Sequence, residues 1–269
     1  MEDTVTRKYY NDKVIWVTGA SSGIGKALCE ALIKTGAWLI ISARKKEVLE
    51  ELKSSLGSDR VHVVALDLNE PNAVKQACQQ ALEWKGRVDI LFNNGGISQR
   101  SEAMDTDQSV VRQIMEVNFF ANVQLTQAVL PGMVESGFGH IVVTSSLMGK
   151  WGFYLRSAYG ASKHALHGYY DSLRMEVETK GIRITLLTPG FIATEISRHA
   201  LVGDGTTSGD MDQNQASGMP VEECADKILR GVACGKAELP IGGKELNGLW
   251  VKRFFPKLFE RILRKQHAR

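Results

Sequence analysis

Short apolar runs alternate with helix-period segments along most of this 269-residue chain. The runs are rich in Val, Ile and Leu and have almost no polar positions, as in VIWVT and VHVVAL. Strands of a parallel sheet have this composition because helices cover both faces of the sheet. We therefore predict a single-domain α/β fold of three layers, a doubly wound parallel sheet. The predicted strands cover residues 14–18, 38–42, 61–66, 88–92, 140–145, 182–188 and 238–242.

The segments between these strands have the apolar spacing of amphipathic helices. They predict helices over residues 23–34, 45–56, 70–84, 107–134, 157–180 and 221–234. Residues 195–219 break the pattern, since they are polar and rich in Gly. A loop of this length in a compact domain is usually functional, and we expect a lid that orders when substrate binds.

The composition narrows the cellular setting. The opening MEDTVTRKYYNDK is polar and mixed in charge, unlike a secretory signal, and no apolar run reaches the roughly 18 residues of a spanning helix. Cys29, Cys78, Cys224 and Cys234 are scattered, which predicts free thiols in a reducing, cytoplasmic compartment. No His or Cys cluster has the spacing of metal ligands, so no metal is expected.

The first predicted strand runs directly into the glycine-rich turn TGASSGIG at residues 18–25, and a helix follows. Such a turn lets the backbone approach a pyrophosphate, whose charge meets free N–H groups at the helix N-terminus. The strand–turn–helix order therefore predicts a Rossmann-type dinucleotide site. The expected contacts are Gly19, Ser21, Ser22, Gly23, Ile24 and Gly25.

The end of the second strand indicates which dinucleotide binds. A carboxylate there would accept from the ribose 2′-hydroxyl of NAD, whereas the 2′-phosphate of NADP needs cations. The sequence has Arg44 and Lys45 and no acid before Glu47. We predict NADP(H), with Arg44 as a donor fork for the phosphate and NAD(H) as the weaker candidate. These cations would otherwise be solvated residues of the next helix.

Tyr159 and Lys163 are four residues apart on a predicted helix, so their side chains share one face. A phenol with a pKa near 10 is a poor acid–base catalyst at neutral pH. A neighbouring ammonium favours the phenolate and lowers that pKa. The pair therefore predicts Tyr159 as the catalytic acid. Alone, the same spacing also fits an interface Tyr beside a surface Lys.

Further motifs occur in a fixed order along the chain. They are Asp67-Leu68, NNGG at 93–96, Asn118, Ser145-Ser146, YGASK at 159–163 and Pro189-Gly190. Together with the glycine-rich turn, this set resembles the short-chain dehydrogenase/reductase family in its single-domain form, from about Lys13 to Gly242. One position departs from the family pattern, since Gly95 stands where an Ala is usual.

The resemblance implies roles for particular residues. Ser146, thirteen residues before Tyr159, would bind the substrate oxygen, in preference to Ser145. Lys163 would also hold the nicotinamide ribose, and Asn118 would anchor a water that relays protons to Lys163. The cofactor contacts implied beyond the turn are Asp67, Leu68, Asn93, Asn94, Gly95, Tyr159, Lys163, Pro189, Gly190, Ile192 and Thr194. The resemblance also implies a homodimer or homotetramer formed through the two long helices.

An apolar substrate pocket is expected beside Tyr159. Phe153, Tyr154 and Leu155 precede it in the sequence and would line the pocket with Ile97 and Phe191. Such a lining suits a lipid-like, steroid-like or aromatic ketone, although these residues could also be core. The prediction is an NADP(H)-dependent oxidoreductase that interconverts a ketone or aldehyde and an alcohol. The alternative is an NADP(H)-binding scaffold or sensor without turnover.

The chain ends in a basic tail, residues 244–269, which we separate from the catalytic and cofactor-binding domain at 1–243. The tail holds eight Lys or Arg and two Glu, whereas the whole chain has a net charge of only +3. Trp, Phe and Leu recur in it at helical spacing, and Pro256 interrupts the helix. This pattern fits peripheral contact with an anionic membrane or a helix packed on the body or a second subunit. No basic stripe continues onto the body, so nucleic acid is not expected.

Overall fold

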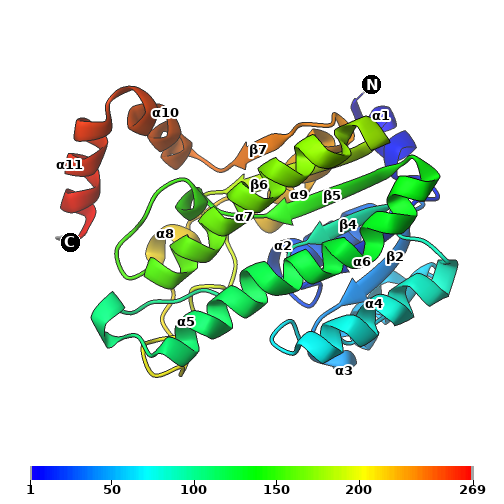
Figure 1. The fold of residues 1–269 in the computed structure, drawn as a ribbon, viewed down its shortest axis with the longest axis horizontal. Coiled ribbons are helices and arrows are strands. Elements are labelled where there is room, and N and C mark those ends of the chain that lie inside the picture. The colour runs from blue at the N-terminus through cyan, green and yellow to red at the C-terminus, as the bar shows by residue number, and fades with distance from the viewer. Residues whose placement is uncertain (1, 268–269) are drawn as a thin grey trace.

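A seven-stranded parallel sheet forms the middle layer of the computed structural model, which describes residues 2–267 (Figure 1). The strand order is β3-β2-β1-β4-β5-β6-β7, with every neighbouring pair parallel. The strands are β1 Val14–Thr18, β2 Trp38–Ser42, β3 Val61–Val63, β4 Ile90–Asn93, β5 Gly139–Thr144, β6 Ile182–Pro189 and β7 Glu238–Ile241. This arrangement confirms the predicted doubly wound fold.

Helices cover both faces of the sheet, which explains the apolar strands (Figure 1). In β1, Ile15 and Val17 belong to one apolar cluster, and Val14 and Trp16 belong to the other. Alternate side chains of a strand point to opposite faces, so both sets must be apolar. One face carries α1 Glu2–Tyr10, α2 Gly23–Ile33, α3 Lys46–Leu56 and α9 Val221–Ala233; the other carries α4 Pro71–Lys85, α6 Ala121–Ser136 and α7 Ser157–Val177.

The strand order reverses between β1 and β4, whose chain neighbours β2 and β5 lie on opposite sides. The loops that leave the carboxyl ends of β1 and β4 therefore separate and leave a crevice there. Ligands of open α/β sheets bind at this switch point. The glycine-rich turn follows β1, and the NNGG segment begins at the last residue of β4.

The structure differs from the sequence prediction in two helices. The segment predicted as one helix over 107–134 consists of α5 Gln108–Met115, a π-helical turn at Glu116–Phe120 and α6. Helix α1 was not predicted, because its residues are polar on most sides. It packs on α9, and the hydroxyl of fully buried Tyr10 donates to the Leu229 carbonyl oxygen at 2.9 Å.

The polar loop between β6 and α9 is folded onto the body in its first half. Leu201 N donates to Ser98 O at 2.8 Å, and Arg100 N donates to Leu201 O at 2.7 Å. The second half contains the short helix α8, Gln213–Ala216. After β7 the chain forms two helices that lie at one end of the molecule, α10 Asn247–Phe254 and α11 Pro256–His267 (Figure 1).

Candidate active site

The glycine-rich turn after β1 comes into backbone contact with the segment after β4. Gly19 has a φ of 66°, and a Cβ there would lie 2.8 Å from Gly95 Cα. Gly23, which begins α2, has a φ of 52°. Both positions use the left-handed region that side chains disfavour. The turn therefore has no side chain of its own at Gly19 or Gly23 beside its backbone N–H groups, which fits a pyrophosphate.

A threonine joins the two sides of this crevice. Thr18 Oγ1 accepts from the backbone N–H of Asn94 and of Gly95, both at 3.0 Å. A Cβ at Gly95 would lie 2.6 Å from Leu68 Cδ1, so Leu68 fills the space of the methyl group that the family pattern has here. The departure at position 95 thus has a local packing cause, and it leaves the crevice intact.

Asn93 lies at the crevice, but its side chain does not face it. Its Nδ2 donates to Thr126 Oγ1 on α6 at 3.1 Å and to the Tyr170 hydroxyl on α7 at 3.2 Å; both helices cover one face of the sheet. Asn93 can therefore contact a cofactor only through its backbone, and its side chain ties β4 to α6 and α7.

Two cations stand at the carboxyl end of β2, next to the glycine-rich turn. Ala20 N donates to Ser42 O at 3.0 Å, which holds the turn against this strand end. Arg44 and Lys45 follow, and both are exposed. Neither forms an ion pair within 4.0 Å among residues 2–267. They are therefore free to meet an anionic group at the adenosine end of the crevice.

Asn118 is at the centre of the π-helical turn between α5 and α6, and it is fully buried. Its Oδ1 accepts from Ile97 N, and its Nδ2 donates to Ile97 O, both at 2.9 Å. The same Nδ2 donates to Ser162 Oγ at 3.0 Å on α7. A π turn inserts one extra residue into a helix and occurs often at functional sites. Here it places Asn118 between the β4 segment and the helix that carries Tyr159.

The two serines after β5 point in different directions. Ser145 is buried, and its hydroxyl contacts His167 Nε2 at 3.0 Å and the Lys163 carbonyl oxygen at 3.2 Å. Ser146 lines the pocket described below and accepts from Met148 N at 3.1 Å. Since Ser146 Oγ uses an acceptor site there, its proton remains available to donate. Ser146, unlike Ser145, therefore lines the pocket.

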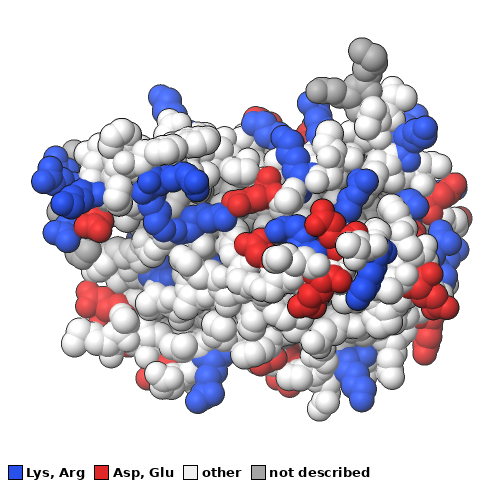
Figure 2. Space-filling model, turned by 45° about the horizontal axis from the view of Figure 1, so that its top comes forward, with Lys and Arg blue, Asp and Glu red and all other residues white. Residues whose placement is uncertain are grey.

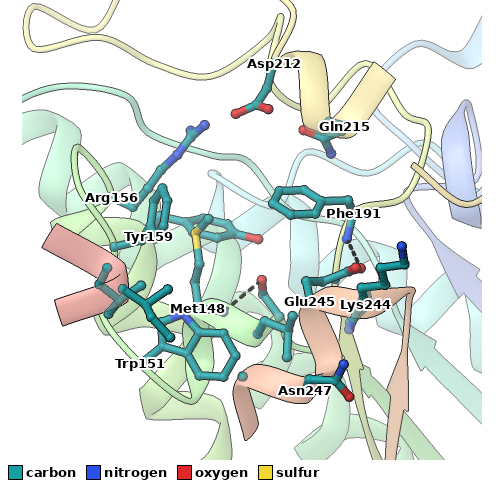
Figure 3. A pocket seen from close by; sticks show the side chains of 18 of the residues that line it. Met148, Trp151, Arg156, Tyr159, Phe191, Asp212, Gln215, Lys244, Glu245 and Asn247 are labelled. Carbon is teal, nitrogen blue, oxygen red and sulfur yellow. Dashed lines mark hydrogen bonds between the residues drawn. The ribbon is translucent and has the colours of Figure 1, made fainter. Parts of the chain in front are cut away.

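Tyr159 is in the first turn of α7, and its hydroxyl points into the pocket (Figure 3). Burial raises the pKa of Tyr159 above its usual value, whereas a hydrogen bond with Ser146 and the charge of Arg156 lower it. A phenol with a raised pKa stays protonated at neutral pH, as a proton donor must. A ligand that brings positive charge would shift the balance toward the phenolate.

Lys163 lies one turn further along α7, with 4% of its surface exposed. Its Nζ is 5.7 Å from the centre of the Tyr159 ring and donates to Thr144 O at 2.8 Å. Burial lowers the pKa of Lys163 to about 8. Two of the three ammonium protons remain for other acceptors, such as ribose hydroxyls.

The segment after β6 closes the crevice from the other side. A Cβ at Gly23 would lie 3.1 Å from Thr194 Cγ2, so Thr194 covers the start of α2. Ile192 pairs with Met219 across the loop, while Pro189 and Gly190 line the pocket. Glu245 from the tail accepts from Phe191 N at 2.9 Å (Figure 3). The glycine-rich turn, the segment after β4 and the segment after β6 thus meet at the carboxyl end of the sheet.

A pocket of about 350 Å³ opens beside Tyr159 (Figure 3). Its lining is mostly apolar and comes from the β5–α7 segment, the loop after β6 and the two tail helices. It includes Ser146, Met148, Trp151, Phe153, Arg156, Tyr159, Phe191, Ile196, Asp212, Gln215, Val251, Phe259, Ile262 and Leu263. The pocket therefore joins the Tyr159 hydroxyl to an apolar cavity.

The predicted lining is right for Phe153 and Phe191 and wrong for three residues. Leu155 has a φ of 60°, and the chain reverses there. Tyr154 faces away and donates to Glu102 Oε1 at 3.0 Å, while Ile97 packs in the core beneath the pocket. Trp151 and the whole contribution of the tail were not predicted, because nothing local in the sequence indicates that two distant segments such as Trp151 and Phe259 meet.

The sequence analysis also missed a buried cation in the pocket wall. Arg156 is 7% exposed, and its Nη1 donates to Ser98 Oγ at 2.9 Å and to Gln99 O at 2.6 Å. Its side chain extends toward Asp212 on the loop after β6 (Figure 3). Arg156 directly precedes α7 and has a non-helical backbone, so no helical spacing in the sequence indicates that it lies in the pocket wall.

Two further features concern the described part of the chain. No helix within residues 2–267 is long and apolar enough to cross a membrane. Within the same residues, no three His, Cys, Asp or Glu side chains are grouped so that they could hold a metal ion.

Comparison with known proteins gives consistent matches. Residues 13–202 match the family model of the short chain dehydrogenases. The chain is 39% identical to dehydrogenase/reductase SDR family member 7B of Danio rerio over 266 residues, 96% of this chain and 86% of that protein. A short-chain dehydrogenase from Sphingobium yanoikuyae in complex with NADPH has 28% identity and a TM-score of 0.75, covering 85% of this chain and 87% of that one. A short chain dehydrogenase/reductase from Burkholderia phymatum in complex with NAD has a TM-score of 0.81 at 22% identity, covering 93% and 95%, and so shows the fold alone.

Proposed function

The chain belongs to the short-chain dehydrogenase/reductase family of oxidoreductases, and from this premise we propose that it interconverts a hydrophobic ketone or aldehyde and the corresponding alcohol with NADP(H). One observation carries the proposal: Tyr159 and Ser146 line the same apolar pocket, with Lys163 buried next to Tyr159. A protein that only binds a dinucleotide would need neither a proton donor nor a hydroxyl aimed into a cavity.

In the proposed reduction, the Tyr159 hydroxyl donates its proton to the carbonyl oxygen of the substrate, and in oxidation the phenolate takes it back. The Ser146 hydroxyl donates to the same oxygen and stabilises the negative charge that develops there. Lys163 holds the ribose hydroxyls of the cofactor, and Asn118 anchors the water that relays protons to Lys163. The bound nicotinamide supplies or accepts the hydride.

The cofactor preference rests on the residues at the end of β2. Arg44 and Lys45 are exposed cations without ion-pair partners among the described residues, beside the turn that would hold the pyrophosphate. A guanidinium matches the geometry of a phosphate, which favours NADP(H) over NAD(H). Arg44→Ala is expected to raise the KM for NADPH at least about tenfold and to change the KM for NADH little. An unchanged KM for NADPH would exclude Arg44 as the phosphate ligand.

The pocket supports the substrate class. Its wall includes the aromatic side chains of Trp151, Phe153, Phe191 and Phe259. Aromatic and aliphatic walls favour apolar ligands because their burial removes apolar surface from water. We therefore propose a ketone or aldehyde with a lipid-like, steroid-like or aromatic body, whose carbonyl group lies at Tyr159 and Ser146.

The direct test is oxidation of NADPH in the presence of a panel of aromatic, steroid and long-chain ketones, with small polar ketones as comparison. Tyr159→Phe is expected to lower kcat by about 100-fold or more while NADPH still binds, because only the transferred proton is removed. Tyr169→Phe, on the same helix and outside the pocket, is the matched control. Activity that survives Tyr159→Phe would overturn the mechanism, and absence of turnover with NADPH binding retained would indicate a scaffold or sensor.

A further inference from the structure

The outer face of the C-terminal helix pair is apolar and exposed. Trp250 (65% exposed), Phe254 (60%), Phe255 (63%) and Leu258 (50%) form what we call the apolar ridge. The Trp250 and Phe254 rings stack on each other with their centres 5.9 Å apart. Half of the large exposed hydrophobic side chains of the described residues lie in α10, in α11 or at Phe255 between the two helices. A concentration of this kind on a water-facing surface marks an interaction site.

The ridge is exposed although the helix pair is attached to the body. Phe259 on α11 is buried, and its ring packs on Trp151 with their centres 5.0 Å apart. Lys252 Nζ donates to Lys150 O, and Glu245 accepts from Phe191 N. The inner face of the pair is therefore fixed as a wall of the pocket. Its outer face finds no apolar partner among the described residues.

The other exposed side chains of the helix pair are mostly basic. Apart from Lys252, which is bonded to Lys150 O, they include Arg253, Lys257, Arg261, Arg264 and Lys265, and the only acidic residue between Lys252 and Lys265 is Glu260. None of these five cations forms an ion pair within 4.0 Å among the described residues. Lysine and arginine side chains gather at this end of the surface (Figure 2). Such a surface attracts an anionic partner and repels a copy of itself.

We propose that α10 and α11 dock the enzyme on an anionic lipid surface, with the apolar ridge in the headgroup–acyl boundary and the cations on the headgroups. A second copy of this chain is the less suitable occupant. A two-fold interface places the same patch against itself, so the unpaired cations would face each other.

With the helix pair docked in this way, one side of the pocket would open toward the lipid; we call this the lipid-side opening. Ile262 lines the pocket and is also 40% exposed, so the wall formed by α11 reaches the outer surface at this residue. An amphiphilic ketone held in the bilayer could pass along α11 to Tyr159 without entering water. This second step rests on the proposed function, whereas docking itself does not.

Docking is tested by sedimentation of the full chain with vesicles of phosphatidylcholine alone or with phosphatidylserine added. We expect binding to the anionic vesicles that weakens with added salt. Lys257→Glu and Arg261→Glu are expected to reduce it by at least about fivefold each. Phe255→Ser with Leu258→Ser is expected to abolish it. Met104→Ser, a change at a large exposed side chain outside the tail, is the matched control and is expected to bind normally.

Tryptophan fluorescence reports the orientation. Trp250 is the tryptophan of the apolar ridge, so brominated phosphatidylcholine in anionic vesicles should quench the wild-type protein and should quench Trp250→Phe much less. Equal quenching of the two proteins would place another face on the membrane and overturn the proposal. Failure to bind anionic vesicles would overturn it as well. A change of oligomeric mass in the ridge variants without vesicle binding would assign the surface to a second copy.

The two steps can fail separately. If both hold, the ridge variants turn over a vesicle-borne ketone several-fold more slowly than wild type and a water-soluble ketone at the wild-type rate. Equal rates on both ketones would overturn the lipid-side opening. If the wild type turns over neither ketone, the proposed function fails, and vesicle binding still decides the docking.

Discussion

The ammonium group of Lys163 donates to the carbonyl oxygen of Thr144, the last residue of β5, over 2.8 Å. The side chain is 4% exposed, and burial lowers its pKa from 10.5 to about 8. The folded protein therefore holds a charge that water would stabilise better. Sites that are arranged for chemistry rather than stability commonly carry such a cost.

We predict that Lys163→Met stabilises the protein at neutral pH while abolishing turnover. In wild type, Lys163 releases its proton near pH 8 in the folded chain but only above pH 10 in the unfolded chain. The free energy of unfolding of the wild type therefore rises between about pH 8 and about pH 10. The burial cost is about 3 kcal/mol at about pH 7 and about 1 kcal/mol at about pH 9.5. Lys163→Met also removes the hydrogen bond to Thr144 O, and this loss reduces the gain in unfolding free energy by the same amount at both pH values.

The advantage of Lys163→Met over wild type should therefore shrink by about 2 kcal/mol between these two pH values. Denaturant unfolding of both proteins at each pH measures this difference. Lys26→Met, a change at an exposed lysine of α2, is the matched control and should show no such trend. An advantage that stays constant with pH would show that Lys163 is not a buried charge at neutral pH.

Arg156 is predicted to set the pH range of activity. Its charge lowers the pKa of Tyr159, against the larger effect of burial. In the proposed mechanism reduction needs protonated Tyr159, so kcat/KM should fall as pH rises through this pKa. In Arg156→Gln the pKa of Tyr159 rises, and the alkaline limb of the profile should move to higher pH. Arg156→Lys keeps the charge and should move it less. A limb that stays in place or moves to lower pH in Arg156→Gln would contradict this role.

Gly95 and Leu68 are predicted to be energetically coupled. An added methyl group at position 95 would lie 2.6 Å from Leu68 Cδ1, so Gly95→Ala should overpack this contact and cost about 1–3 kcal/mol. Leu68→Ala removes the obstacle, and the double variant should be more stable than the sum of the single changes by about 1 kcal/mol. Denaturant unfolding of the four proteins measures the coupling. If the two stability changes are strictly additive, contact with Leu68 does not explain why position 95 is a glycine.

Much of the fold and of the candidate site follows from local sequence patterns. Strands buried on both faces need continuous apolar runs, and the spacing of Tyr159 and Lys163 places both on one side of α7. The choice of Ser146 over Ser145 came from the family spacing of thirteen residues to Tyr159, and it stays a prediction. Each of these relationships depends on residues close together in the sequence or on a motif of fixed length.

The rest depends on contacts between distant segments. The π-helical turn at Asn118 has no signal in helical periodicity, since one inserted residue shifts the apolar pattern only slightly. Helix α1 is held by Tyr10 on Leu229, more than 200 residues away. The left-handed backbone of Leu155 decides which of its neighbours face the pocket, and no residue type there indicates it. The largest omission was the tail, whose pattern fits a free amphipathic helix and also a pocket wall.

Helix α11 of the tail forms part of the pocket wall, and Phe259 attaches it to the body. Phe259 is 6% exposed and packs edge-on against Trp151, whose ring also lines the cavity. Phe259→Ala should remove this contact and weaken the packing of α11 on the body by about 3 kcal/mol. In vesicle-free buffer, kcat/KM should fall about tenfold for a bulky apolar ketone and stay within about twofold for a small one, because the small one does not reach α11.

Steady-state kinetics with both ketones measure the effect, and hydrogen exchange of α11 reports whether the helix has loosened. Phe255→Ala, a change at an exposed ring of the same helix pair, is the control and should alter neither rate in that buffer. Equal losses for the two ketones would mean that the change disturbs Tyr159 itself. No loss for the bulky ketone would mean that its apolar body lies elsewhere, toward Phe153 and Phe191.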